Sequence, residues 1–333
     1  MKPGGKARTV RPESAQAETA VADAARAGEF APDPRLLAAM RRLELTARQV
    51  VAEAASGLHP GRRPGAAREF SQYRAYQAGD DPRRIDWKLL ARSDRYYLRE
   101  GELDTRVTME VVLDATESMQ HRGAGGAPSK FEVARSLAAA FGWLAEMQGD
   151  GLSLHVVARG AVESIATAGR RQPFRRLVHA LSSAEPSGRW PADPRVLGRA
   201  VRRSERSAGS TATGTVAHVT IVLTDGHESD GEIRTALAPL RGPRHEVLFL
   251  CLVSPDERDF PYRGATRFTE WETGRTLDAD AAAVRAAFLA AADKARAAWR
   301  RLWGGEHFGY LEVMTDQRLD RVVRAYLRRR AAR

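Results

Sequence analysis

Cysteine is almost absent from this chain of 333 residues, in which Cys251 is the single example. One cysteine cannot form an intramolecular disulfide, which excludes the disulfide-stabilised scaffolds of small secreted proteins. No apolar run exceeds the seven residues Val247–Val253, whereas a membrane-spanning helix needs roughly 18 or more. The first residues carry charges without an apolar segment behind them, so no secretory signal is predicted. We therefore expect a cytoplasmic protein with no integral membrane segment.

Lysine is scarce as well, and arginine supplies nearly all of the positive charge that gives the chain its formal net charge of +11. Basic proteins bind nucleic acids, anionic surfaces or acidic partners. The arginines are spread along the chain and do not form one block interleaved with aromatic residues, so nucleic acid is not the favoured partner. Hydrophobic residues make up 43% and charged residues 29% of the chain, which is typical of a globular protein.

Changes in composition divide the chain into three parts. Residues 1–32 are rich in Ala, Glu, Arg and Pro, which predicts a disordered tail. Residues 33–105 begin with apolar residues at helical spacing between Leu36 and Val51. After a connector rich in Gly and Pro, they continue into a block dense in aromatic residues and paired charges. Residues 106–333 show strand and helix patterns in alternation.

The third part is predicted to be a doubly wound α/β domain. Apolar runs predict strands over 107–113, 152–157, 161–166, 218–224 and 246–253. Helical periodicity predicts helices over 131–145, 173–181, 193–203, 232–240 and 284–302, the first of them opened by a capping box of Ser129 and Glu132. Strands that are apolar on both faces and alternate with helices indicate a mainly parallel sheet covered on both sides. We expect the last helix to dock on this sheet, in preference to forming a coiled coil with a partner.

Two of the predicted core strands end on an aspartate, at Asp114 and Asp225. Ligands of open parallel sheets bind beyond the carboxyl ends of the strands, so both side chains are expected at the ligand-binding edge. Thr116 and Ser118 follow at a spacing of two, and a tight loop can turn Asp114 and both hydroxyls toward one point. Such oxygen donors suit Mg²⁺, Mn²⁺ or Ca²⁺. In the structural alternative, the hydroxyls cap the next segment and Asp225 starts a turn with Gly226.

The pattern resembles a von Willebrand factor A domain. The residues that carry the resemblance are a strand closing on D-x-[ST]-x-S-M, a helix opened by a turn containing lysine and glutamate, and a strand closing on T-D-G. The resemblance implies a metal-ion-dependent adhesion site, in which an acidic residue of a partner fills an open coordination position on the cation. The matching ligands in this chain are Asp114, Thr116, Ser118 and Asp225.

Two departures from that family pattern concern the cation. Thr116 stands where serine is usual, which keeps the hydroxyl. The family also has a threonine in the loop before the helix that precedes the T-D-G strand, and Ser187–Pro194 contains none. Ser187 or Asp193 would have to replace it, although Asp193 is better explained as a helix N-cap. Mg²⁺ or another hard divalent cation is therefore the expected cofactor, at a site that lacks one family ligand.

The block before this domain is similar to the signature of the domain of unknown function 58 family, in which such a block also runs into a von Willebrand A-like domain. Physically, the glycine and Asp-Pro pair predict a turn, and the aspartates and arginines predict a charge-assisted network. A catalytic carboxylate pair is the less favoured alternative, because no nucleophile or histidine lies nearby in sequence. The signature residues are Tyr73, Arg74, Tyr76, Gly79, Asp80, Asp81, Pro82, Arg83, Arg84, Asp86, Trp87 and Arg92.

This second resemblance implies a non-enzymatic adaptor that works with a MoxR-type AAA+ ATPase on an unknown client protein, in assembly or metal insertion. One alternative is a metal-dependent phosphoester hydrolase that uses the same aspartates, although the sequence offers no evident general base or second metal. A further alternative is nucleic-acid binding through the arginine excess. The sequence contains no P-loop, no G-x-G-x-x-G after a strand and no G-x-S-x-G.

Overall fold

A computed structural model describes most of the chain. The described residues are 33–56, 72–77, 85, 87–93, 95–100, 107–123, 126–166, 172–207, 217–227, 231–240, 245–271, 273–304 and 308–331. The tail predicted over residues 1–32 lies outside them, and the division into three parts stays a prediction. No helix within the described ranges has both the length and the hydropathy that crossing a membrane would require.

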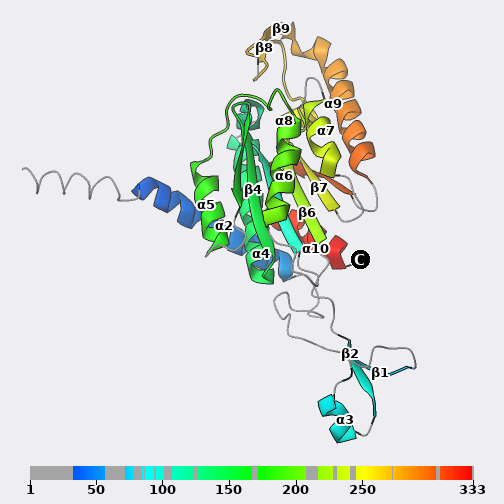
Figure 1. Ribbon diagram of the computed structural model, residues 1–333. Coiled ribbons are helices and arrows are strands. Elements are labelled where there is room, and N and C mark those ends of the chain that lie inside the picture. Colours follow the sequence, from blue (N-terminus) through cyan, green and yellow to red (C-terminus); the bar gives the residue numbers. More distant parts are fainter. Residues whose placement is uncertain are drawn as a thin grey trace, which may run out of the picture.

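A sheet flanked by helices lies at the centre of the molecule (Figure 1). It has six strands in the order β10-β7-β6-β3-β4-β5. Neighbouring strands are parallel except at the β4–β5 pair, which is antiparallel. The predicted doubly wound, mainly parallel α/β sheet is therefore confirmed, and β10 is a strand that the sequence did not predict. The strands are β3 (Val107–Asp114), β4 (Gly151–Ala158), β5 (Ala161–Ala166), β6 (Ala217–Thr224), β7 (His245–Val253) and β10 (Phe308–Met314).

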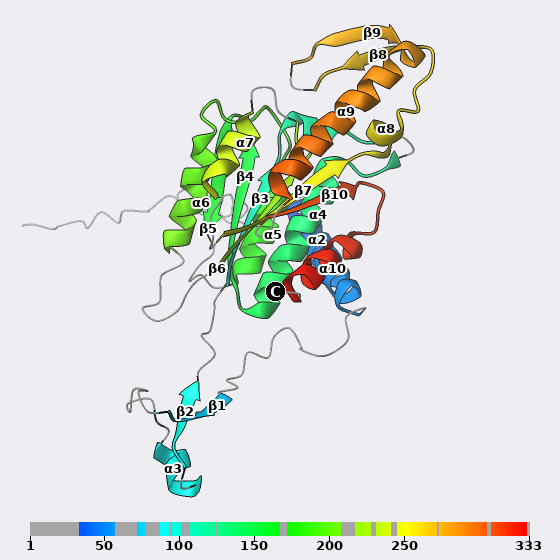
Figure 2. The ribbon, with the colours of Figure 1, turned by 90° about the vertical axis from the view of Figure 1, so that its right-hand side faces the viewer.

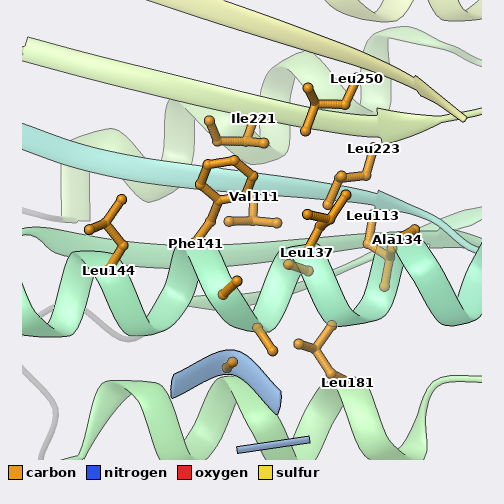
Figure 3. Packing of buried hydrophobic residues seen from close by; sticks show 14 of the residues in the cluster. Val111, Leu113, Ala134, Leu137, Phe141, Leu144, Leu181, Ile221, Leu223 and Leu250 are labelled. Atoms are coloured by element: carbon orange, nitrogen blue, oxygen red, sulfur yellow. The ribbon is translucent and has the colours of Figure 1, made fainter. Parts of the chain in front are cut away.

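Helices cover both faces of this sheet. Alternate strand residues point to opposite faces, so Val111 and Leu113 belong to one apolar cluster and Val112 belongs to the other. Figure 3 shows the first cluster, with strand side chains facing α4. One face carries α2 (Pro34–Ala55), α4 (Lys130–Gln148), α5 (Pro173–Ser183) and α10 (Leu319–Ala331), and the other carries α6 (Arg195–Ser207), α7 (Glu232–Leu237), η4 (Ala238–Leu240) and the end of α9 (Ala281–Trp303).

Helix α2, which the sequence assigns to residues 33–105, is part of the core of the sheet domain. Its buried residues include Ala47 and Val51, which pack in the same cluster as α4, α5 and α10. Two arginines of the C-terminal region also bind it: Arg318 pairs with the Glu53 carboxylate at 2.8 Å, and Arg324 donates to the Glu53 carbonyl at 2.6 Å. Residues from the two ends of the described chain therefore share one packed layer.

The long helix α9 docks on the sheet only through its C-terminal end. Trp299 and Trp303 stack on Phe249 of β7, with ring centroids 4.9 and 5.8 Å apart. Between Ala281 and Trp299 no residue of this helix is buried, so the predicted docking holds for the last turns alone. Before α9 come α8 (Pro255–Asp259) and a hairpin of β8 (Ala265–Thr269) and β9 (Thr276–Asp280), which stands beyond the carboxyl ends of the parallel strands (Figure 2).

The family signature falls partly on a small two-stranded sheet. Strands β1 (Gln72–Ala75) and β2 (Tyr97–Glu100) are antiparallel, and α3 (Trp87–Ser93) lies between them in sequence. Tyr73 and Arg74 are on β1, Tyr76 follows it, and Trp87 and Arg92 are on α3. The turn and charge network remain predictions, because they involve residues outside the described ones: Gly79, Asp80, Asp81, Pro82, Arg83, Arg84 and Asp86.

Candidate functional site

The carboxylate of Asp114 is buried at the end of β3 and accepts four hydrogen bonds. Its Oδ1 accepts from Thr116 N at 3.0 Å and Thr116 Oγ1 at 2.7 Å. Its Oδ2 accepts from Thr224 Oγ1 at 2.6 Å and from Trp190 Nε1 at 3.1 Å. Thr116 Oγ1 also lies 3.3 Å from Ser118 Oγ. The loop therefore brings Asp114, Thr116 and Ser118 together, as the spacing predicts.

The loop after β3 is fixed by backbone hydrogen bonds to its neighbours. Ala115 donates to Val157 of β4 and accepts from Ser187, while Glu117 donates to the Gly188 carbonyl, all at 2.8–2.9 Å. The chain then turns into the short 3₁₀ helix η2 (Glu117–Gln120). Thr116 occupies the N-cap position of that helix, but its side chain makes no capping hydrogen bond. Its hydroxyl donates to Asp114 instead, so Thr116 does not cap the next segment as the structural alternative predicts.

Asp225 lies at the end of the neighbouring strand β6 and is paired with a buried lysine. Lys130 Nζ lies 3.1 Å from Asp225 Oδ2 and 2.5 Å from Glu257 Oε1. Burial alone would raise the pKa of Asp225, but the Lys130 ammonium and the His227 N–H outweigh it and lower that pKa. Conversely, burial would lower the pKa of Lys130, yet the two carboxylates raise it. The site thus contains its own positive charge.

Two of these participants escaped the sequence prediction. The sequence predicts Lys130 only as part of the turn that opens α4, because its partner Asp225 is 95 residues away. Glu257 belongs to a capping box in which Ser254 N and Oγ both donate to Glu257 Oε2. The string Ser254-Pro255-Asp256-Glu257 carries the S-x-x-E signature of that motif, so the cap was readable from the sequence. Its proximity to Lys130 was not.

Trp190 stands in the loop where the family pattern has a threonine. Its indole N–H donates to Asp114, and an indole nitrogen of this kind is a donor only. Ser187 Oγ accepts from Arg159 Nε at 2.9 Å. Asp193, exposed in the turn just before α6, accepts from Arg195 N and pairs with Arg199. The side-chain hydrogen bonds described for Ser187 and Asp193 are thus made to arginines and to the Arg195 amide, and none is made to Asp114.

The donor set nevertheless fits a hard divalent cation. Burial, followed by the negative charge of Asp225, raises the pKa of Asp114. The four hydrogen bonds that this carboxylate accepts all come from uncharged groups. The hydroxyls of Thr116 and Ser118 can rotate to present oxygen lone pairs. In the described part of the chain, no group of three or more His, Cys, Asp and Glu side chains has metal-binding geometry. A cation here would rely on two carboxylates and two hydroxyls, and Lys130 would compete for Asp225.

The fold and the site define a class: an α/β protein whose mainly parallel sheet gathers carboxylates and hydroxyls at its carboxyl edge. A family model described as "Protein of unknown function DUF58" matches residues 72–298. The chain belongs to this family. It is 30% identical over 291 residues to the uncharacterized protein Rv1480 of Mycobacterium tuberculosis and to the uncharacterized protein Mb1516 of Mycobacterium bovis, with 86% of each chain covered.

Solved structures with a similar arrangement are more distant. The conserved hypothetical protein BatB from Bacteroides thetaiotaomicron has a TM-score of 0.42 at 17% identity, with 68% of this chain and 100% of that chain covered. The SpRpn10 VWA domain has a TM-score of 0.37 at 11% identity, with 66% of this chain and 94% of that chain covered. Since the names of these relatives in sequence give no function, a function for this chain has to be inferred from the geometry of its own site.

Proposed function

We propose that this protein is a non-enzymatic adaptor that binds other proteins through the carboxyl edge of its sheet. The observation that carries the proposal is the convergence of Asp114, Thr116 and Ser118 beside Asp225. These are oxygen donors on two adjacent strand ends, held in place by backbone hydrogen bonds. Ligands of open parallel sheets bind at this edge.

A hard divalent cation such as Mg²⁺ would be held by Asp114, Thr116, Ser118 and Asp225. When bound, it would supply a positive charge to which an acidic side chain of a partner can attach. The protein's own groups hold Asp114 in one orientation through Thr224 and the Trp190 indole, so the carboxylate is positioned in advance. Lys130 neutralises Asp225 and limits the negative charge that a partner carboxylate would meet.

The hydrolase alternative receives less support from the site. The Asp114 carboxylate is surrounded by a backbone amide, two hydroxyls and an indole, and these do not act as general bases at neutral pH. Lys130 is held protonated by its two carboxylate partners, which removes it as a base. The groups in contact with Asp114 and Asp225 therefore favour binding over proton transfer.

The resemblance to the domain of unknown function 58 family suggests the partner. We propose a MoxR-type AAA+ ATPase, together with an unknown client protein, acting in the cytoplasm in assembly or metal insertion. The net charge of +11 is compatible with an acidic partner surface.

Co-purification tests this proposal. The tagged chain and its Asp114→Ala variant are incubated with lysate of the source cells in Mg²⁺ or in EDTA. We expect a MoxR-type ATPase to be retained only by the unaltered chain in Mg²⁺. Asp193→Ala, which removes an exposed carboxylate away from the site, is the control and should retain it. Equal retention in EDTA, or by Asp114→Ala, would refute the cation bridge, and no ATPase in any sample would refute the partnership.

A further inference from the structure

The candidate cation site opens into a cleft of about 730 Å³. Ser118, Lys130 and Asp225 line its floor, which is the carboxyl edge of the sheet. The opposite wall is built by α8, the β8–β9 hairpin and the start of α9, beyond the strand ends in Figure 2. A volume in this range is typical of sites that enclose a ligand. The floor of the cleft and the candidate cation site therefore share residues.

The wall contains an aromatic cluster that is incompletely covered, beside polar and charged residues such as Arg267, Glu270 and Arg275. Phe260 contacts Phe268 and Phe288, with ring centroids 5.7 and 5.0 Å apart. Next to this cluster, Trp271, Leu277 and Phe288 are 44, 57 and 40% exposed. Exposed large apolar side chains that gather in one place mark interaction sites, whereas scattered ones do not. Among the described residues, the other large apolar side chains exposed to this degree lie away from the cleft: Leu45, Trp87, Tyr96 and Met147.

The hairpin directs its apolar side chains to one face. Phe268 of β8 is directly opposite Leu277 of β9, and both line the cleft. The next cross-strand pair along the hairpin, Arg267 and Asp278, forms an exposed ion pair at 2.7 Å. Successive side chains on a strand point to opposite faces, so Phe268 and Leu277 share one face while Arg267 and Asp278 share the other, although Arg267 also lines the cleft. An apolar face on an exposed hairpin is typical of a surface that contacts a ligand or another protein.

Two contacts attach the wall to the floor, so the cleft is preformed. His121 Nε2 of the floor lies 2.9 Å from Asp256 Oδ2 of α8, and Lys130 Nζ lies 2.5 Å from Glu257 Oε1 of the same helix. Within the wall, Tyr262 donates to Asp256 Oδ2 at 2.5 Å, and Arg285 of α9 donates to the Asp259 carbonyl at 2.7 Å. A site that needs no rearrangement loses less affinity to ordering on binding.

We propose that this cleft binds a peptide segment of the partner protein in which an acidic residue is adjacent to bulky apolar residues. The acidic side chain reaches the cation site beside Ser118, and the apolar side chains cover Phe268, Leu277 and Phe288. The acidic residue of the peptide is inferred from the proposed function, whereas its apolar residues are inferred from the wall alone. Both are assigned to one peptide because the floor and the wall line the same cleft.

Selection of random peptides displayed on phage tests this inference with the full chain. Selection in Mg²⁺ should enrich peptides that carry Asp or Glu within two positions of Phe, Trp, Leu or Met. A synthetic peptide of the enriched sequence should bind the unaltered chain and lose affinity about tenfold or more on Leu277→Asp. Leu45→Asp is the matched control, because Leu45 is 67% exposed on α2 and lies outside the cleft. It should leave the affinity unchanged.

The variants test the role of the apolar wall and the role of the cation bridge independently. Loss of binding on Leu277→Asp but not on Asp114→Ala supports the apolar wall and refutes the bridge. Loss on Asp114→Ala but not on Leu277→Asp or Phe288→Asp refutes the cleft and leaves the bridge. The inference would be overturned if no peptide were enriched or if the enriched sequences lacked apolar residues. It would also be overturned if the wall mediated concentration-dependent self-association in place of peptide binding. Both wall residues are exposed, so circular dichroism should show unchanged folding of these variants.

Discussion

At the scale of single residues, the most informative group is Lys130, which lies between two carboxylates. The chain has few lysines, and this one is buried at the first position of α4, where Asp225 and Glu257 both reach its ammonium group. An ion pair of this kind is costly to break from one side, because the remaining charge is left buried without a partner. Lys130 therefore determines how much negative charge the candidate cation site carries.

Replacing Lys130 tests this role. Lys130→Met should destabilise the protein by about 3 kcal/mol, since Asp225 would be left buried and unpaired. Added Mg²⁺ should recover part of that loss, because a cation can take the place of the ammonium beside Asp225. Urea unfolding with and without Mg²⁺ measures both effects. Lys294→Met, on the exposed part of α9, is the matched control and should change stability little. An equal effect of both variants would contradict the role assigned to Lys130.

The single cysteine offers a second test at this scale. Cys251 is buried in β7, and burial raises the pKa of its thiol to about 12. Since the thiolate is the reactive form, the native protein should not react with Ellman's reagent at mildly alkaline pH. The unfolded chain in guanidinium chloride should release one equivalent of the coloured thiolate. Rapid reaction of the folded protein would contradict the burial of β7.

At the scale of elements, the turn after β6 depends on Gly226. Its φ is +70°, and a Cβ there would lie 2.7 Å from Trp299 Nε1. The indole also donates to the Gly226 carbonyl at 3.1 Å, so helix α9 is attached to the strand end that carries Asp225. The D-G pair in the sequence predicted a turn, but the contact with a tryptophan 73 residues away could not be predicted.

Substitution of Gly226 is therefore expected to lower the free energy of unfolding by more than the strain of its positive φ alone would. Gly226→Ala should destabilise the protein by about 3 kcal/mol, from the strained φ together with displacement of Trp299. Gly231→Ala, at φ +74° with nothing within 4 Å of its Cβ position, should cost roughly 1 kcal/mol. Thermal unfolding of the two variants provides the comparison. Equal losses would show that Trp299 does not press on this turn.

The elements that the sequence predicted well are those buried on both faces. Strands β3, β6 and β7 are rich in apolar residues, and α4 carries its capping box in four consecutive residues. The hairpin β8–β9 was not predicted, since β8 only alternates exposed and half-buried residues and β9 is mostly exposed. The apolar side chains of the hairpin line a cleft and do not belong to the core, so its hydrophobic pattern is too weak to be recognised from the sequence alone.

At the scale of the whole molecule, the candidate site is assembled from segments far apart in the chain. Asp114, Thr116 and Ser118 were predictable because they are neighbours in sequence, and Asp225 because it ends a recognisable core strand. Trp190 and Glu257 were not, since Trp190 is 76 residues from Asp114 and Glu257 is 127 residues from Lys130. Local patterns identify oxygen donors at strand ends, whereas the order of strands decides which other groups join them.

The binding of a divalent cation is the central claim and can be measured directly with Mn²⁺, which is paramagnetic. Titration of the full chain, followed by electron paramagnetic resonance of the free ion, should reveal a single Mn²⁺ site per chain that Mg²⁺ displaces. Asp114→Ala should abolish that site, and Asp193→Ala should retain it. Absence of binding to the unaltered chain, or equal binding by Asp114→Ala, would contradict the account and leave Lys130 as the site's own cation.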